Sequence, residues 1–238
     1  MSTSLLLLGL AVLLGTLVQS TLGFGLAVVA APAVIVAEPE LMPTSLLLLG
    51  FALPTMQLLT QPRDIAWRLL GWALGWRLLL TAPGVWLVAV LPAAGIAAVV
   101  GVLVLVSVVL SLVRLEATAT PRNAALAGAI TGVSGTAAAI GGPFFALVLQ
   151  HEAPDRIRST LAAFFVVGSA GSLAGLALGG QVTGEQLRAG LVWLPFLVAG
   201  LLLSGPVRRH VDQRRMRAGV LALCVLASVV VLVRAALS

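Results

Sequence analysis

Two clusters of small and polar residues interrupt apolar stretches of the chain, one cluster in each half. They consist of Gln19, Ser20, Thr21, Gly23 and Gly25 in the first half, and of Ser134, Gly135, Thr136, Gly141 and Gly142 in the second. Hydroxyl, carboxamide and backbone N–H groups donate hydrogen bonds, and glycine lets a bound group approach the backbone closely. These residue types, without a carboxylate among them, predict a site that binds a small anion.

Arg77 is the third candidate for this chemistry, because it lies inside the apolar stretch 66–91. About 11 residues into a helix it would be roughly 16 Å deep in a membrane, where a charge costs on the order of 3 kcal/mol or more. Arg77 could face a cavity and attract the anion. It could instead snorkel, or bind the carbonyls of a broken helix. The sequence leaves both interpretations open.

The acidic residues lie away from these candidates, each in an expected loop or at a helix end. They are Glu38, Glu40, Asp64, Glu116, Glu152, Asp155, Glu185 and Asp212. A cation site or a carboxylate proton relay would need at least one acid deep in the membrane. His151 and His210 also fall in loops, and Cys224 is the only cysteine. We therefore expect neither a metal site nor a cofactor.

The composition is that of a polytopic membrane protein. Apolar residues make up 60% of the 238 residues and charged residues 9%, and the mean hydropathy is +1.14, values outside the range of soluble domains. The net charge of +6 comes from fourteen arginines, most of them in short loops, where they set topology rather than bind nucleic acid. The expected partners are the lipid bilayer and a small anionic substrate. The sequence leaves a homodimer open.

The apolar stretches divide the chain into two similar halves. The stretch from Leu5 to Ala37 would form a helix of roughly 50 Å, longer than a hydrocarbon core of about 30 Å, so we expect it to break into pieces of about 15 and 13 residues. Residues 123–150 contain the second break. Three spanning helices follow each broken stretch, at 44–60, 66–91 and 93–113, and at 159–179, 185–204 and 216–234. We expect an N-terminal repeat at 1–113 and a C-terminal repeat at 123–238.

The arginine distribution indicates whether the broken stretches cross the membrane. If both cross, the arginines divide between the two sides with no bias. If both are re-entrant hairpins, eleven arginines share one side, only Arg188 and Arg234 oppose them, and Arg77 is inside. The positive-inside rule favours the hairpins. The predicted fold is therefore all-α, with two inverted repeats, each a broken re-entrant hairpin plus three transmembrane helices, and with both termini outside the cytoplasmic membrane.

Such hairpins suit an anion, because the second half-helix of each begins at the tip. A helix N-terminus presents unpaired N–H groups and about half a positive charge, and Pro143 suits the first turn. Small residues also allow tight helix packing, as Gly128 and Gly132 would. For any single glycine we favour packing; for the two clusters together we favour an anion site.

Four motifs occur in order along the chain: QSTLGFG at 19–25 followed by Pro32, SGTAAAIGGP at 134–143, RSTLAAFFVVGSAGSLAGLALGG at 158–180 and RRHVDQRRMRAGVLAL at 208–223. In these features the chain resembles the sulfite exporter TauE/SafE family of membrane transporters over essentially its full length. The resemblance implies a transporter, not an enzyme, that exports or takes up sulfite, sulfoacetate or another organosulfonate. The first repeat departs from the second in lacking Gly-Gly-Pro.

Two other functions use the same residues. Facing hairpin tips also form pores, so an anion channel is an alternative to a carrier. The residues from Gly132 to Gly135 have the GxSG form of rhomboid-type intramembrane proteases, which need a histidine on a neighbouring helix. Neither histidine lies inside an apolar stretch and the chain has no lysine, so we reject a protease.

Overall fold

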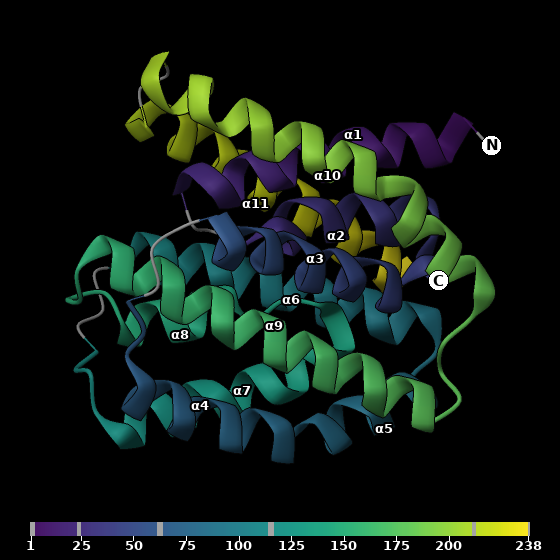
Figure 1. The fold of residues 1–238 in the computed structure, drawn as a ribbon. Coiled ribbons are helices and arrows are strands. Elements are labelled where there is room, and N and C mark those ends of the chain that lie inside the picture. Colours follow the sequence, from purple (N-terminus) through teal and green to yellow (C-terminus); the bar gives the residue numbers. More distant parts are fainter. Residues whose placement is uncertain (1–2, 23–24, 61–63, 114–116, 211–212, 238) are drawn as a thin grey trace.

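Most helices run roughly along one common direction, which we take as the bundle axis (Figure 1). The structure is a computed structural model and describes residues 3–22, 25–60, 64–113, 117–210 and 213–237, among which there is no strand. The helices are α1 (Thr3–Leu22), α2 (Leu26–Ala37), η1 (Pro39–Leu41), α3 (Thr44–Thr60), α4 (Trp67–Leu79), α5 (Thr81–Val90), α6 (Ala93–Leu112), α7 (Pro121–Ala138), α8 (Gly142–Val148), α9 (Pro154–Leu178), α10 (Gly184–His210) and α11 (Gln213–Leu237).

Six helical stretches among the described residues are long and apolar enough to cross a membrane. They are α1, α4 together with α5, α6, α9, α10 and α11. The helices α2 and α3 are apolar but shorter, with 12 and 17 residues. At 1.5 Å per residue, α2 is only about 18 Å long, less than the thickness of a hydrocarbon core. The expected multi-pass membrane protein is therefore confirmed.

The first broken stretch differs from the expected division at about 15 residues. Helix α1 has 20 residues and continues through Gln19, Ser20 and Thr21. These polar side chains do not interrupt it, because a side chain can bond within the helix: Thr21 Oγ1 donates to Leu17 O at 2.7 Å. The break comes later, before α2, at Gly25, whose φ of 100° favours glycine. As a result α1 alone is long enough to span.

The second break separates α7 from α8. Helix α7 ends at Ala138, and the next residue, Ala139, has a φ of 58°, which lies in the left-handed region. Helix α8 then begins at Gly142 with Pro143 in its first turn, and it has only seven residues. Proline is tolerated there because the first N–H groups of a helix have no partner within it. This break lies inside the expected stretch 123–150.

A third break, which the sequence did not lead us to expect, divides the stretch 66–91 into α4 and α5 at Leu80. Pro83 explains it, because a proline ring clashes with the carbonyl four residues earlier and lacks an N–H. Thr81 Oγ1 compensates by donating to Arg77 O at 3.0 Å. Arg77 therefore lies in the last turn of α4, next to an irregular backbone.

The helix contacts keep their pattern when the two halves are exchanged. The first helix of each half packs on the helix pair or helix that comes third after it in the other half's order: α1 packs on α10, and α7 packs on α4. The first long helices, α3 and α9, pack on each other, as do the last, α6 and α11. Each broken stretch, α1–α2 in the first half and α7–α8 in the second, thus packs against helices of the opposite half.

Glycines bring the backbones of two of these pairs close together. A side chain at Gly128 or Gly132 of α7 would overlap the carbonyl oxygens of Ala73 and Arg77 in α4. On the other seam, a side chain at Gly200 of α10 would approach Leu13 O of α1 to 2.6 Å. Gly128 and Gly132 therefore serve the packing that we considered for them.

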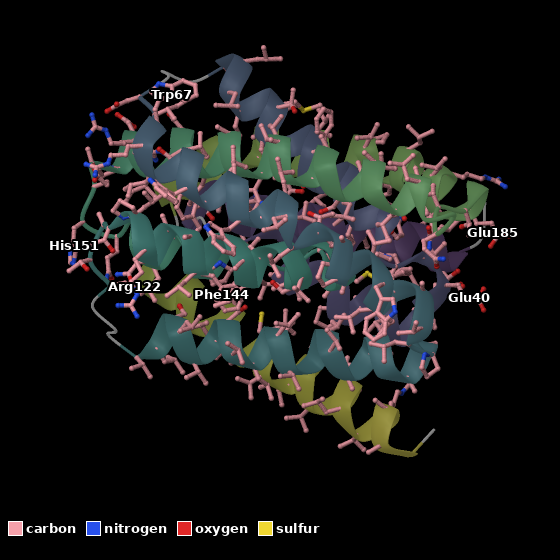
Figure 2. All side chains as sticks on the ribbon, turned by 90° about the horizontal axis from the view of Figure 1, so that it is seen from below. Glu40, Trp67, Arg122, Phe144, His151 and Glu185 are labelled. Carbon is pink, nitrogen blue, oxygen red and sulfur yellow. The ribbon has the colours of Figure 1, made fainter. Side chains whose placement is uncertain are left out.

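The two ends of the bundle differ in charge. Figure 2 shows Trp67, Arg122 and His151 at one end, and Glu40 and Glu185 at the other. Helix α10 ends and α11 begins at the first end, whereas α1 begins and α11 ends at the second (Figure 1). Arg156, at the start of α9, binds Asp64 at 3.0 Å and Glu152 at 3.3 Å. We call the first end the arginine end and the second the terminal end.

We expect the arginine end to face the cytoplasm, because loops rich in arginine stay on the cytoplasmic side. A reporter enzyme that is active only outside the cytoplasm should therefore be active when fused after Ser238. The matched control is the same reporter inserted at the α10–α11 turn, where it should be silent. Activity in the turn and silence at the C-terminus would reverse the orientation.

We also expect Ala139→Gly to stabilise the protein, because glycine relieves the left-handed conformation, which costs a residue with a side chain roughly 1–2 kcal/mol. Part of this gain is lost to the greater freedom of glycine in the unfolded chain, about 0.4–1 kcal/mol. The Tm in detergent should therefore rise by about 2 °C. Ala137→Gly, inside α7, should lower it. Equal losses in both variants would contradict the backbone geometry at this break.

Candidate functional site

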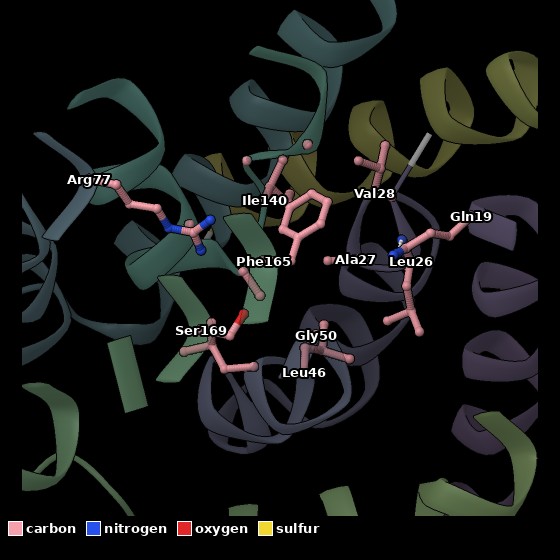
Figure 3. A pocket seen from close by; sticks show the side chains of 16 residues that line it. Gln19, Leu26, Ala27, Val28, Leu46, Gly50, Arg77, Ile140, Phe165 and Ser169 are labelled. Carbon is pink, nitrogen blue, oxygen red and sulfur yellow. Dashed lines mark hydrogen bonds between the residues drawn. The ribbon is translucent and has the colours of Figure 1, made fainter. Parts of the chain in front are cut away.

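A small cavity of about 30 Å³ lies between the two breaks (Figure 3). Both halves of the chain line it. Its walls are Gln19, Gly25, Leu26, Ala27 and Val28 of the first break, Leu46, Leu47 and Gly50 of α3, Arg77 of α4, Gly135, Ala139, Ile140, Gly141 and Gly142 of the second break, and Phe165 and Ser169 of α9. Six predicted residues therefore meet in one place: Gln19, Gly25, Arg77, Gly135, Gly141 and Gly142.

Among the described residues, Arg77 is the only charged one that lines this cavity. Its side chain is 2% exposed, and Nη1 donates to Phe164 O of α9 at 3.1 Å. The guanidinium carbon lies 4.4 Å from the centroid of the Phe164 ring, within the range of a cation–π contact. Nε has no hydrogen-bond partner, and no ion pair is formed with a described carboxylate. The charge of this guanidinium is thus left uncompensated by the described residues.

Gln19 organises the first break. Its Oε1 accepts a hydrogen bond from the N–H of Leu26, the first residue of α2, at 2.5 Å. In Figure 3, Gln19 and Arg77 lie on opposite sides of the cavity. The first N–H groups of a helix have no partner within it, and those of Ala27 and Val28, which line the cavity, form no backbone bond to a described residue outside the helix. Gly25 supplies the turn that directs α2 back into the bundle.

Two other predicted residues of the first cluster, Ser20 and Thr21, are not among the cavity walls. Thr21 is bonded within α1, as described above. Ser20 Oγ is buried and has no hydrogen-bond partner among the described residues. Gly23 lies outside the described residues.

In the second break, hydroxyl groups hold the backbone rather than line the cavity. Thr131 Oγ1 donates to Ala127 O at 2.7 Å and lies 3.2 Å from Gly141 O, so it ties α7 to the start of α8. Thr136 Oγ1 lies 2.7 Å from Gly132 O and 2.8 Å from Ser172 Oγ of α9. Ser134 Oγ is buried without a partner among the described residues. Neither Thr136 nor Ser134 is a wall of the cavity.

Sequence reasoning missed the contribution of α9. Phe165 and Ser169 line the cavity, and the carbonyl of Phe164 anchors Arg77. The available signal was the run of small residues from Gly168 to Gly171 in an apolar helix, a pattern typical of close helix contacts. The residues of α9 are therefore as much a part of the site as the two breaks.

The acidic side chains whose contacts the structure gives lie outside the cavity. Glu38 accepts a hydrogen bond from Ser4 at 2.9 Å, and Asp155 binds Arg158 at 2.6 Å. Glu116 and Asp212 lie outside the described residues. Within the described part of the chain, no group of three His, Cys, Asp or Glu side chains is placed to hold a metal ion. The cavity is consequently neutral to positive.

Comparison with known proteins gives one match. Searches of the curated proteins and of the solved structures found none. The model of one protein family, described as sulfite exporter TauE/SafE, matches residues 7–231 of the 238. The match includes both breaks, Arg77 and all six potential spanning stretches, at least in part. The chain is therefore a member of the sulfite exporter TauE/SafE family of membrane transporters.

Proposed function

We propose that this protein exports a small sulfur-containing anion, such as sulfite, sulfoacetate or another organosulfonate, across the cytoplasmic membrane. The observation that carries the proposal is the buried guanidinium of Arg77, which faces the cavity between the two breaks without a carboxylate partner among the described residues. The sulfite exporter family supports the chemical class of the substrate. Export, rather than uptake, is the direction that we propose.

The charge of Arg77 favours an anionic ligand. A guanidinium remains protonated in proteins, and an ion in a low-dielectric interior is costly unless it is paired. Phe164 O and the aromatic ring satisfy part of the group. A bound sulfonate or sulfite oxygen would compensate the remaining charge and accept from Nε, which has no partner.

The breaks would fix the position of the anion. The N–H groups of Ala27 and Val28 belong to the first turn of α2, and the Gln19 carboxamide retains its NH₂ group beside them. Helix α8 has only seven residues, so its contribution to the field is smaller than that of a full half-helix. Arg77 therefore supplies most of the attraction, and the backbone at the breaks supplies the geometry.

The size of the cavity favours a carrier over a channel. A volume of about 30 Å³ is room for about two water molecules. Even sulfite would enter only if the lining side chains or the two breaks moved apart. The interchangeable helix contacts of the two halves support inverted repeats, 1–113 and 123–238, whose rocking would open the cavity to either side in turn. In this arrangement both breaks act as re-entrant tips.

A channel remains the alternative, and the flux distinguishes the two. A carrier saturates with substrate, because each cycle moves a fixed number of anions, whereas a pore conducts at far higher rates. The protease alternative has no support: Ser134 is buried in α7 with no hydrogen-bond partner among the described residues, and His151 lies at the arginine end (Figure 2).

We expect Arg77→Gln to weaken sulfite binding by about tenfold or more, because the substitution removes the charge and keeps much of the side-chain shape. Stability without ligand should change little, since an uncompensated buried cation is removed as well. Both quantities are measured on purified protein, the affinity from the concentration dependence of the ligand-induced rise in Tm. Thiosulfate, sulfoacetate, taurine and sulfate serve as comparison ligands.

The opposite pattern would contradict the proposal. If Arg77 only clasps the Phe164 carbonyl, Arg77→Gln should lower the Tm without ligand and leave the affinity of the folded fraction nearly unchanged. An unchanged affinity in a stable variant would likewise mean that the anion is bound elsewhere.

A further inference from the structure

We infer that Gly168 of α9 is a positioning residue for Arg77: the space left by its missing side chain is the slot that holds the guanidinium at the cavity. The inference rests on the proposed function, in which Arg77 attracts the anion. Gly168 is buried and lies one helical turn after Phe164. It is not itself a wall of the cavity.

The guanidinium head of Arg77 occupies the space next to Gly168. A methyl group built at Gly168 would overlap Cζ, Nε and Nη1 of Arg77, and these are its three nearest heavy atoms. The same guanidinium is bonded to Phe164 O at 3.1 Å and lies 4.4 Å from the Phe164 ring centroid. Residues four apart share one face of a helix. On the face of α9 that contacts Arg77, Phe164 therefore supplies a carbonyl and an aromatic ring, and Gly168 leaves the slot.

A second glycine, on α7, also lies beside the guanidinium. A methyl group at Gly135 of α7 would lie 3.5 Å from Nη2 of Arg77, which is ordinary contact. The guanidinium thus fits between α7 and α9. If a side chain filled the slot at Gly168, the arginine head would move, because it is the flexible end of a long side chain and α9 is a packed backbone. The moved head would lose its bond to Phe164 O.

Gly171 provides a matched control on the same helix. A methyl group there would approach Cδ2 of Leu78 in α4, which is again the flexible end of a side chain. Leu78 is 43% exposed, so it can turn away at little cost. Both substitutions therefore add a methyl group to α9 and displace a side chain of α4. Only Gly168→Ala displaces the cation.

The first measurement is the affinity for sulfite and sulfoacetate in the two variants. We expect Gly168→Ala to lower the affinity by about tenfold, because the charge is kept but misplaced, and Gly171→Ala to change it by less than about twofold. A Gly168→Ala protein that binds both anions as tightly as the parent overturns the inference.

The second measurement is the Tm without ligand, in the parent and in the Arg77→Ala background. Because the nearest neighbours of the new methyl group all belong to Arg77, Gly168→Ala should lower the Tm of the parent and have little effect once Arg77 is truncated. Recovery of folding in the double variant would support the slot even if Gly168→Ala alone did not fold. An equal loss in both backgrounds, or a double variant that fails to fold when Arg77→Ala folds, would refute it.

These measurements separate the inference from the proposed function. If Arg77→Gln leaves sulfite binding intact, the proposed function fails, while the Tm comparison still decides whether Gly168 forms the slot. If Arg77→Gln weakens binding and Gly168→Ala does not, only the role of Gly168 is lost.

Discussion

The buried guanidinium of Arg77 is the constraint on which the rest of the site depends. An arginine at membrane depth is costly unless polar groups or an opposite charge meet it. Here one carbonyl, the rings of Phe164 and Phe165 and two glycines surround the group, and no described carboxylate pairs with it. The fold must therefore place polar backbone near the middle of an apolar bundle.

Breaks in the helices make that polar backbone available. In lipid, irregular backbone survives only where protein or a water-filled cavity satisfies it. The breaks at Gly25 and Ala139 meet at one cavity, and the third, at Leu80, lies three residues after Arg77. Side chains satisfy part of the freed backbone: Gln19 caps α2, Thr131 reaches Gly141 O, and Thr81 reaches Arg77 O.

Packing across the two halves holds these breaks together. Helix α7 packs on α4 through Gly128 and Gly132. The second break, which follows α7, and Arg77, which lies in α4, therefore belong to two helices in close contact. Helix α1 rests on α10 through Gly200, where Trp193 Nε1 also donates to Leu5 O at 2.9 Å. Small residues thus have two uses in this chain: close packing along the seams, and space for Arg77 at Gly168.

The sequence allowed the helical membrane fold, both main breaks and the burial of Arg77 to be predicted, because hydropathy and a lone charge in an apolar stretch are local signals. The extent of α1 was not predictable from composition, since polar residues such as Gln19 and Thr21 are compatible with a helix when their side chains bond nearby backbone.

The direction in which individual hydroxyl groups point could not be predicted from the sequence either. Thr136 bonds toward Gly132 and Ser172 rather than lining the cavity, and only the rotamer decides between the two. The slot at Gly168 depends on a contact between helices 91 positions apart in the chain, Arg77 in α4 and Gly168 in α9. A single sequence carries no signal for such a contact beyond a run of small residues.

The most direct test of the account is to locate the anion itself, using selenite as an analogue of sulfite whose selenium gives an anomalous diffraction signal. The account predicts one strong selenium peak in the cavity, with its oxygens in hydrogen-bonding reach of the Arg77 guanidinium and of the backbone at Ala27 and Val28. A peak at another place in the bundle, with the cavity between the breaks empty, would contradict it.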